Sequence, residues 1–279
     1  MEFLPYGRQN IEKEDIEAVI EALNGDLLTT GPIVNLFESK FAKLTGAKYA
    51  VAVSNGTAAL HLACLACGLG EGDVAIVPAI SFLATANAPS FCGSKVIFCD
   101  VEADTGIMNA QTFEAAILQA KEKGLNVKVV IPVHLTGRPV DLTAIKKIAA
   151  ANKIKVIADS CHALGGEIGK APIGACKYED FSTFSFHPVK TICTGEGGAI
   201  TTNNKNLADF MKTMRHHGIT KRSRENPWLY KMDRLGFNYR ITDFQCALGI
   251  SQLGKLEKMI NIRADLVSKY NKNITKISS

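Results

Sequence analysis

The sequence predicts an α/β protein with a largely parallel sheet that is covered by helices on both faces. Short apolar segments at 74–77, 96–99, 127–133 and 155–158 alternate with helical patterns along the chain. Polar residues close several of these segments, and parallel strands bring such residues to one edge of a sheet. The 279 residues are 47% hydrophobic and 21% charged, which suits a globular chain with a large core.

Helical spacing of apolar residues justifies the other elements. Ile16, Val19, Ile20 and Leu23 recur on one side of the first predicted helix. The predicted helices cover residues 12–23, 33–44, 58–67, 82–91, 110–121, 142–151 and 207–214, with a helical stretch over 243–270. Further short strands are predicted at 49–53 and 181–186.

The segment Ser54-Asn55-Gly56-Thr57-Ala58 joins a predicted strand to a predicted helix. Free backbone N–H groups and the helix dipole favour an anion at such a helix start, and Gly56 allows the backbone a close approach. The alternative interpretation is an ordinary helix cap at Asn55 or Thr57. The segment is therefore a candidate phosphate site.

Two strand ends carry charged residues that suit catalysis. Lys190 lies just beyond the predicted strand 181–186, before the glycines of TGEGG, and Asp159 closes the strand that ends in VIA. Separately, the lysine could be a solvated surface charge and the aspartate a cap of the next turn. Pyridoxal phosphate needs donors for its phosphate, a lysine for its aldehyde and a carboxylate for its ring nitrogen. The three strand ends together supply this set.

Composition argues against several other classes of protein. The net charge of +5 is spread along the chain, so nucleic-acid binding is not indicated. The uncharged run 74–91 contains prolines and an asparagine, so we expect no membrane span, and the N-terminus lacks a signal-peptide pattern. Cys64 and Cys67 form a C-x-x-C without a second pair at zinc-finger spacing. We expect these two thiols to be buried and expect no metal site. We also expect the eight cysteines to be reduced and the protein to be cytoplasmic.

Motifs along nearly the whole chain resemble the DegT/DnrJ/EryC1/StrS family of fold-type-I, pyridoxal-phosphate-dependent sugar aminotransferases. The motifs are LTTGP, SNGTAALHLA, ADSCHALG, SFHPVKTICTGEGGAITTN and LGFNYRITDFQCALG. The resemblance implies a mostly parallel seven-stranded sheet within a large domain, residues 1–250, that includes an N-terminal helical segment. Residues 251–279 are expected to begin the linker helix of a small C-terminal domain that is otherwise truncated or absent.

The resemblance also implies roles for individual residues. Pyridoxal 5′-phosphate is the expected cofactor, with Lys190 as its Schiff-base lysine and proton shuttle and Asp159 as the partner of its ring nitrogen. Further expected cofactor contacts are His162 at the phenolic oxygen, Phe82 on the ring face, and Thr57, Ala58 and Ser185 at the phosphate. Asn238, in GFNYR, is expected to reach the phosphate of the neighbouring subunit, so a homodimer with shared active sites is implied.

FSFHPVK and FLPYGRQ most resemble the branch of the family that aminates carbon 4 of a UDP-linked 4-keto-6-deoxy-N-acetylhexosamine, with glutamate as donor, in pseudaminic acid biosynthesis. Alternatives are another nucleotide-linked keto sugar, of the 4-amino-arabinose or perosamine type, and a non-catalytic cofactor-binding regulator. A sugar 3-dehydratase would carry histidine in place of the lysine, so Lys190 argues against that activity.

Substrate contacts are expected mainly from basic residues. The candidates are Tyr6, Thr30, His187, His217 and Lys221. The basic group of Arg215, His216, His217, Lys221 and Arg222 follows the predicted helix 207–214. Its charges could hold the diphosphate of a nucleotide sugar through charge-assisted hydrogen bonds.

Overall fold

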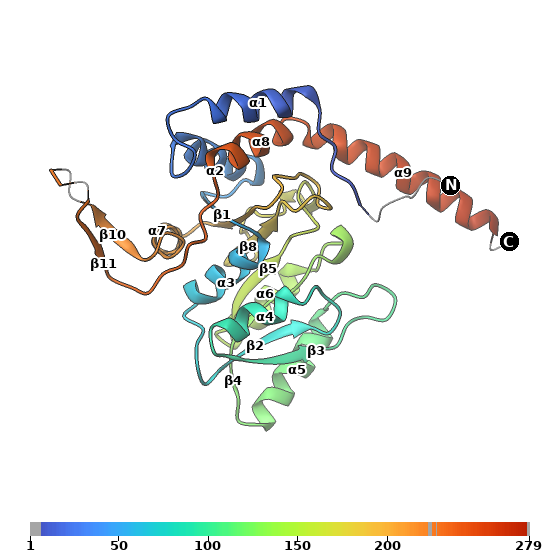
Figure 1. Ribbon diagram of the computed structural model, residues 1–279. Helices are drawn as coiled ribbons and strands as arrows, with labels where there is room; N and C mark the ends of the chain where they lie inside the picture. The colour runs from blue at the N-terminus through green and yellow to red at the C-terminus, as the bar shows by residue number, and fades with distance from the viewer. Residues whose placement is uncertain (1–6, 223–224, 227, 278–279) are drawn as a thin grey trace.

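A seven-stranded sheet runs through the computed structural model, which describes residues 7–222, 225–226 and 228–277 (Figure 1). Its strands are β1 (Tyr49–Val53), β2 (Asp73–Pro78), β3 (Lys95–Cys99), β4 (Asn126–Val130), β5 (Lys155–Asp159), β8 (Phe181–Ser185) and β9 (Gly198–Thr202). Their order across the sheet is β1-β9-β8-β5-β4-β2-β3. Strands β8, β5, β4, β2 and β3 are parallel, and β9 is antiparallel to both of its neighbours. The predicted fold class is confirmed.

Helices cover both faces of this sheet. They are α1 (Lys13–Leu23), α2 (Pro32–Thr45), α3 (Gly56–Ala66), α4 (Ala84–Phe91), α5 (Ala110–Glu122), α6 (Leu142–Ala151), α7 (Lys205–Met214), α8 (Asp243–Leu253) and α9 (Leu256–Ile277). Smaller elements are the helix η1 (Leu135–Gly137), the pair β6 (Glu167–Ile168) and β7 (Ala171–Pro172), and the hairpin of β10 (Ile219–Arg222) and β11 (Tyr230–Met232). No helix in the described ranges combines the length and apolar composition that a membrane span requires.

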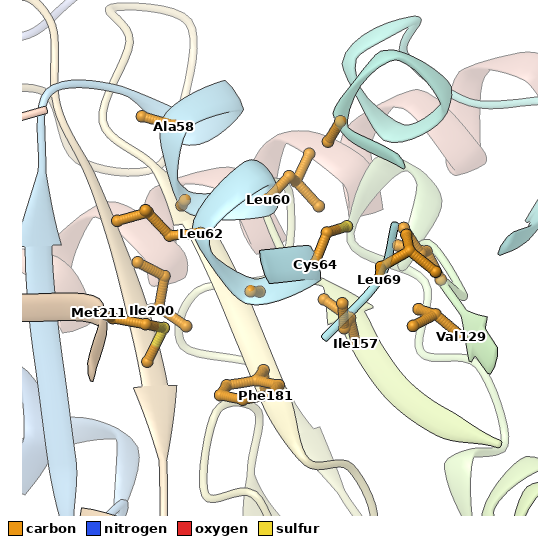
Figure 2. Close-up of a cluster of buried hydrophobic side chains, with 14 of the residues drawn as sticks. Ala58, Leu60, Leu62, Cys64, Leu69, Val129, Ile157, Phe181, Ile200 and Met211 are labelled. Atoms are coloured by element: carbon orange, nitrogen blue, oxygen red, sulfur yellow. The ribbon is translucent and has the colours of Figure 1, made fainter. Parts of the chain in front are cut away.

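Side chains alternate between the two faces of the sheet along each strand, and each face packs against a different set of helices. One face packs against α3, α4 and α7, with Ile157, Phe181 and Ile200 beneath Leu62 and Cys64 of α3 (Figure 2). The opposite face packs against α2 and α8 at the β1 end and against α5 and α6 at the β4 end. Because side chains two residues apart share a face, Asp159 lies on the α3 side with Ile157.

Three element boundaries differ from the sequence predictions. Strand β4 ends at Val130, before the expected 133, since Pro132 has no N–H to continue the ladder. The helical stretch predicted over 243–270 consists of two helices, α8 and α9, which are separated at Gly254, a residue of low helix propensity. Strand β9 was not identified by pattern, because three glycines immediately precede or open it. The expected domain boundary near residue 250 stays a prediction.

The start of α3 approaches the sheet so closely that side chains are excluded at two positions. A Cβ on Gly198 would lie 2.5 Å from both the carbonyl carbon and the oxygen of Asn55. A Cβ on Gly56 would lie 2.8 Å from Cβ of Ser185. Because glycine has no Cβ, backbone packs against backbone where α3 meets β9, and the backbone of α3 packs against the Ser185 side chain where it meets β8.

We predict that Gly198→Ala lowers the free energy of unfolding by about 1–3 kcal/mol, the usual cost of overpacking a close contact. The clashing atoms belong to the main chain of Asn55, so no side-chain rotation relieves them. Thermal unfolding of the purified variant measures the effect. Gly70→Ala is the matched control, since a Cβ there has nothing within 4 Å. Equal melting temperatures for the two variants would contradict the prediction.

Candidate active site

The ends of β5 and β8 and the start of α3 open into a cleft with a volume of about 840 Å³. Most of the residues predicted from the sequence line this one cleft. They are Thr57, Phe82, Asp159, His162, Ser185, His187 and Lys190. Segments more than a hundred residues apart in the chain are brought together here by the parallel strand order.

The first turn of α3 forms one wall of the cleft. Asn55 caps the helix, with its Oδ1 accepting a hydrogen bond of 2.8 Å from the N–H of Ala58. The N–H groups of Gly56 and Thr57 precede the first bond inside the helix and so have no intrahelical partner. Ser185, at the end of β8, faces this turn across the close contact with Gly56. N–H groups without an intrahelical partner, a hydroxyl and a helix N-terminus together line the cleft, and such a set suits a phosphate.

Ala58 differs from the expectation for a phosphate contact. Its N–H is already bonded to Asn55, its side chain is buried, and it is not among the residues that line the cleft. The capping interpretation therefore holds for Asn55 and the N–H of Ala58. An anion site at the two preceding N–H groups stays a prediction.

Asp159 ends β5 with its carboxylate almost fully buried, at 5% exposure. Oδ2 accepts a hydrogen bond of 2.9 Å from the hydroxyl of Thr85. Oδ1 accepts one of 3.2 Å from the backbone N–H of Cys161. Burial and then the negative charge of Asp159 raise the pKa of the Cys161 thiol, so that thiol stays protonated in the floor of the cleft.

His162 is held by the loop that follows β4. Its Nδ1 accepts a hydrogen bond of 3.2 Å from the N–H of Thr136, which leaves the ring proton on Nε2. Burial, followed by the positive charge of Lys190, lowers the pKa of His162, and Asp159 opposes this shift. The imidazole is consequently neutral at pH 7 and offers an N–H donor.

Lys190 lies in the loop between β8 and β9, half-buried in the cleft. Its backbone N–H donates to the carbonyl of His187 over 2.8 Å, and its carbonyl accepts from Nη2 of Arg263 over 3.1 Å. Arg263 belongs to α9 and also lines the cleft. The loop is therefore held by a contact within itself and by a contact with α9, a helix that begins more than sixty residues later in the chain.

Phe82 completes the predicted cofactor contacts at the rim. Its ring is 63% exposed and lies in the loop before α4, among the residues that line the cleft. An amine, a buried acid, a neutral histidine, an apolar ring and a phosphate cradle thus share one space. This donor set fits pyridoxal phosphate.

The predicted substrate contacts are not all brought together. Thr30 lines a separate pocket of about 320 Å³, with Arg240 and His216, and His217 lines neither cavity. Asn238 also lies outside the cleft of its own chain, where its backbone pairs with His216. Tyr6 and the side chain of Lys221 lie outside the described part of the chain.

Arg215 requires a correction. The sequence suggested a cation on the cleft rim, but the guanidinium is largely buried and donates to Glu38 and to the carbonyl of Ala52. Glu38 in turn accepts from the backbone N–H of Ala52 and pairs with Lys212. Arg215 therefore ties α7 to α2 and β1, because a carboxylate buried there needs a charge partner.

Sequence reasoning missed Thr85, Thr136 and Arg263. A threonine in the first turn after Phe82 was visible in SFLATAN, yet nothing in that pattern relates it to Asp159. Arg263 belongs to a helix whose position is set by tertiary packing. These partners could be identified only once the elements were assembled.

Comparison with known proteins agrees with the geometry. The model of the DegT/DnrJ/EryC1/StrS aminotransferase family matches residues 9–279. The UDP-4-amino-4,6-dideoxy-N-acetyl-beta-L-altrosamine transaminase of Campylobacter jejuni is 39% identical over 273 residues, which is 98% of this chain and 70% of that protein.

Solved structures show the same similarity. The pyridoxal-phosphate form of the putative sugar aminotransferase Spr1654 of Streptococcus pneumoniae superposes with a TM-score of 0.88 at 28% identity, over 98% of this chain and 71% of that one. Helicobacter pylori PseC, an aminotransferase involved in the biosynthesis of pseudoaminic acid, superposes with a TM-score of 0.82 at 31% identity, over 92% and 66% of the two chains. The chain therefore belongs to the DegT/DnrJ/EryC1/StrS family of pyridoxal-phosphate-dependent sugar aminotransferases.

Proposed function

We propose that this protein transfers the amino group of glutamate to carbon 4 of a UDP-linked 4-keto-6-deoxy-N-acetylhexosamine. The observation that carries the proposal is the meeting of Lys190, Asp159 and the start of α3 in one cleft. The substrate rests on the similarity to the Campylobacter jejuni transaminase, whose name specifies such an amino sugar. We expect the enzyme to work in the cytoplasm, where its eight free thiols would stay reduced.

The residues of the cleft divide the work between binding and proton transfer. The N–H groups at the start of α3 and the hydroxyl of Ser185 would hold the phosphate of the cofactor, and Phe82 would cover its ring. Asp159 would keep the ring nitrogen protonated, and Nε2 of His162 would donate to the phenolic oxygen. When bound, pyridoxal phosphate supplies an electron sink and carries the amino group between the two substrates.

Lys190 moves the protons. Its Nζ takes the α-proton of the amino donor, and in the second half of the reaction it returns a proton to carbon 4 of the sugar. The loop contacts to His187 and Arg263 hold the main chain of Lys190 in place while its flexible side chain reaches between these positions. The depressed pKa of His162 keeps a second cation away from the lysine amine.

The substrate is tested by loading the protein with pyridoxamine phosphate and adding a panel of keto sugar nucleotides. We expect the aldehyde absorbance band to return with the UDP-linked 4-keto-6-deoxy-N-acetylhexosamine. Return of the band only with a 4-keto pentose, with another 4-keto hexose or with a 3-keto sugar would replace the proposed substrate. The remaining outcome is that the protein converts pyridoxal phosphate to pyridoxamine phosphate with glutamate and yet shows no aldehyde band with any sugar of the panel. That result would contradict the assignment of a sugar substrate altogether.

Lys190→Ala should retain the phosphate and ring contacts but slow the conversion of pyridoxal phosphate to pyridoxamine phosphate by at least about 100-fold, the scale of general acid–base catalysis. Absorbance spectra recorded after glutamate addition follow this half-reaction. Lys170→Ala, on the exposed turn between β6 and β7, is the matched control and should react like the wild type. A wild-type rate in Lys190→Ala would show that another group moves the proton.

A homodimer with shared active sites is also part of the proposal. The β10–β11 hairpin projects from the body of the protein, as Figure 1 shows. Apolar side chains on the hairpin and just after it are exposed: Trp228 is 73% exposed, Tyr230 62% and Leu235 82%. Asn238, at the base of this hairpin, lies outside the cleft of its own chain, so a phosphate contact would have to be made in a partner. An apolar arm of this kind suits burial against a second copy.

Sharing predicts complementation between two inactive variants. Asn238→Ala should weaken cofactor retention, and Lys190→Ala should lack the proton shuttle. A mixed dimer contains one site with both wild-type residues, so mixing should restore up to about a quarter of the wild-type activity when subunits exchange at random. Native mass spectrometry can confirm the exchange if one variant carries a tag that changes its mass, because the mixed dimer then has an intermediate mass. Confirmed exchange without recovered activity would mean that each subunit builds its own site.

A further inference from the structure

Thr85 lies directly behind Asp159, in the first turn of α4. Its side chain is fully buried, and its Oγ1 is 2.9 Å from Oδ2 of Asp159. An ionised carboxylate only accepts hydrogen bonds, so the threonine hydroxyl must be the donor.

Two donors on different oxygens hold the carboxylate of Asp159 in one plane. Thr85 donates to Oδ2, and the backbone N–H of Cys161 donates to Oδ1. Rotation of the carboxylate would break both bonds. Each oxygen keeps a second lone pair, so the group can still accept from a ligand in the cleft.

His134 adds no competing charge beside this acid. Its backbone N–H donates to the carbonyl of Asp159 over 3.1 Å, and its imidazole is fully buried. Nδ1 of His134 accepts from the N–H of Val140 over 3.0 Å. Burial lowers the pKa of this imidazole to about 4, and Asp159 opposes the shift, so the ring is neutral at pH 7. The negative charge of Asp159 stays available to a cation in the cleft.

Thr85 also belongs to the turn that carries Phe82. Its backbone N–H donates to the carbonyl of Phe82 over 3.0 Å. The main chain of Thr85 therefore contacts Phe82, the predicted ring-face residue. The side chain of Thr85 contacts Asp159, the predicted partner of the ring nitrogen. A shift of the turn would move both contacts together.

We propose that Thr85 is a positioning residue that fixes the Asp159 carboxylate for the ring nitrogen of the cofactor and couples it to the Phe82 turn. This inference rests on the proposed roles of Asp159 and Phe82. Thr85 is not among the residues that line the cleft, so its effect passes through the acid. Without its hydroxyl, a buried carboxylate oxygen loses a donor, and only the N–H of Cys161 still orients the acid.

The test compares Thr85→Val, which removes only the donor, with Thr85→Ser, which keeps it. We expect Thr85→Val to raise the dissociation constant of pyridoxal phosphate about tenfold, the loss expected for one buried hydrogen bond to a charged group. Thr85→Ser should stay within about threefold of wild type. Equilibrium titration by protein fluorescence measures the constant, and thermal unfolding without cofactor measures stability. Thr183→Val is the matched control, since its buried hydroxyl donates to the carbonyl of Ala158 instead.

A double-mutant cycle with Asp159→Asn separates positioning from general packing. If Thr85 acts through the acid, Thr85→Val should change cofactor affinity less than about twofold in the Asp159→Asn background. A full tenfold loss in that background would overturn the inference. So would equal affinity of the wild type and Thr85→Val, or an equal loss in Thr183→Val. Failure of the wild type itself to bind pyridoxal phosphate would instead overturn the proposed function, and the inference with it.

Discussion

The close approach of the first turn of α3 to the ends of β8 and β9 is the contact on which the site depends. It exists because Gly56 and Gly198 have no side chains: Gly198 packs against the main chain of Asn55, and Gly56 packs against the side chain of Ser185. The approach aims the unpaired N–H groups of the helix into the cleft and places Ser185 beside them. A single Cβ at either position would separate the helix from the strands and disperse the anion cradle.

The sheet converts this local contact into a reaction site. Parallel order brings the carboxyl ends of β5 and β8 together, and the two-residue period of the strands turns Asp159 toward the face that α3 and α4 cover. Asp159 then meets Thr85 from α4, while His162 meets Thr136 from the loop after β4. Each chemical group is therefore oriented by an element other than the one that carries it. Such support is what keeps a site at a fixed geometry.

Burial sets the protonation state of two side chains in the cleft. Burial lowers the pKa of His162 and raises the pKa of Cys161, so both remain neutral at pH 7. Asp159 is fixed by hydrogen bonds, and Arg215 is occupied with Glu38 away from the cleft. Among the residues lining the cleft, Lys190 carries an amine on a flexible side chain, and its main chain is anchored by Arg263. This arrangement suits the proposed role of Lys190 as the proton carrier.

The sequence by itself determined the alternation of strands and helices and the chemistry at the strand ends. Lys190, Asp159 and the turn at Asn55 could be identified because their type and position relative to a strand are local features. Only the tertiary structure decided which atoms are available. Asn55 occupies the N–H of Ala58, Glu38 neutralises Arg215, and Thr85 and Arg263 join the site from distant elements. These outcomes depend on contacts between segments far apart in the chain, and local sequence patterns carry no information on such distances.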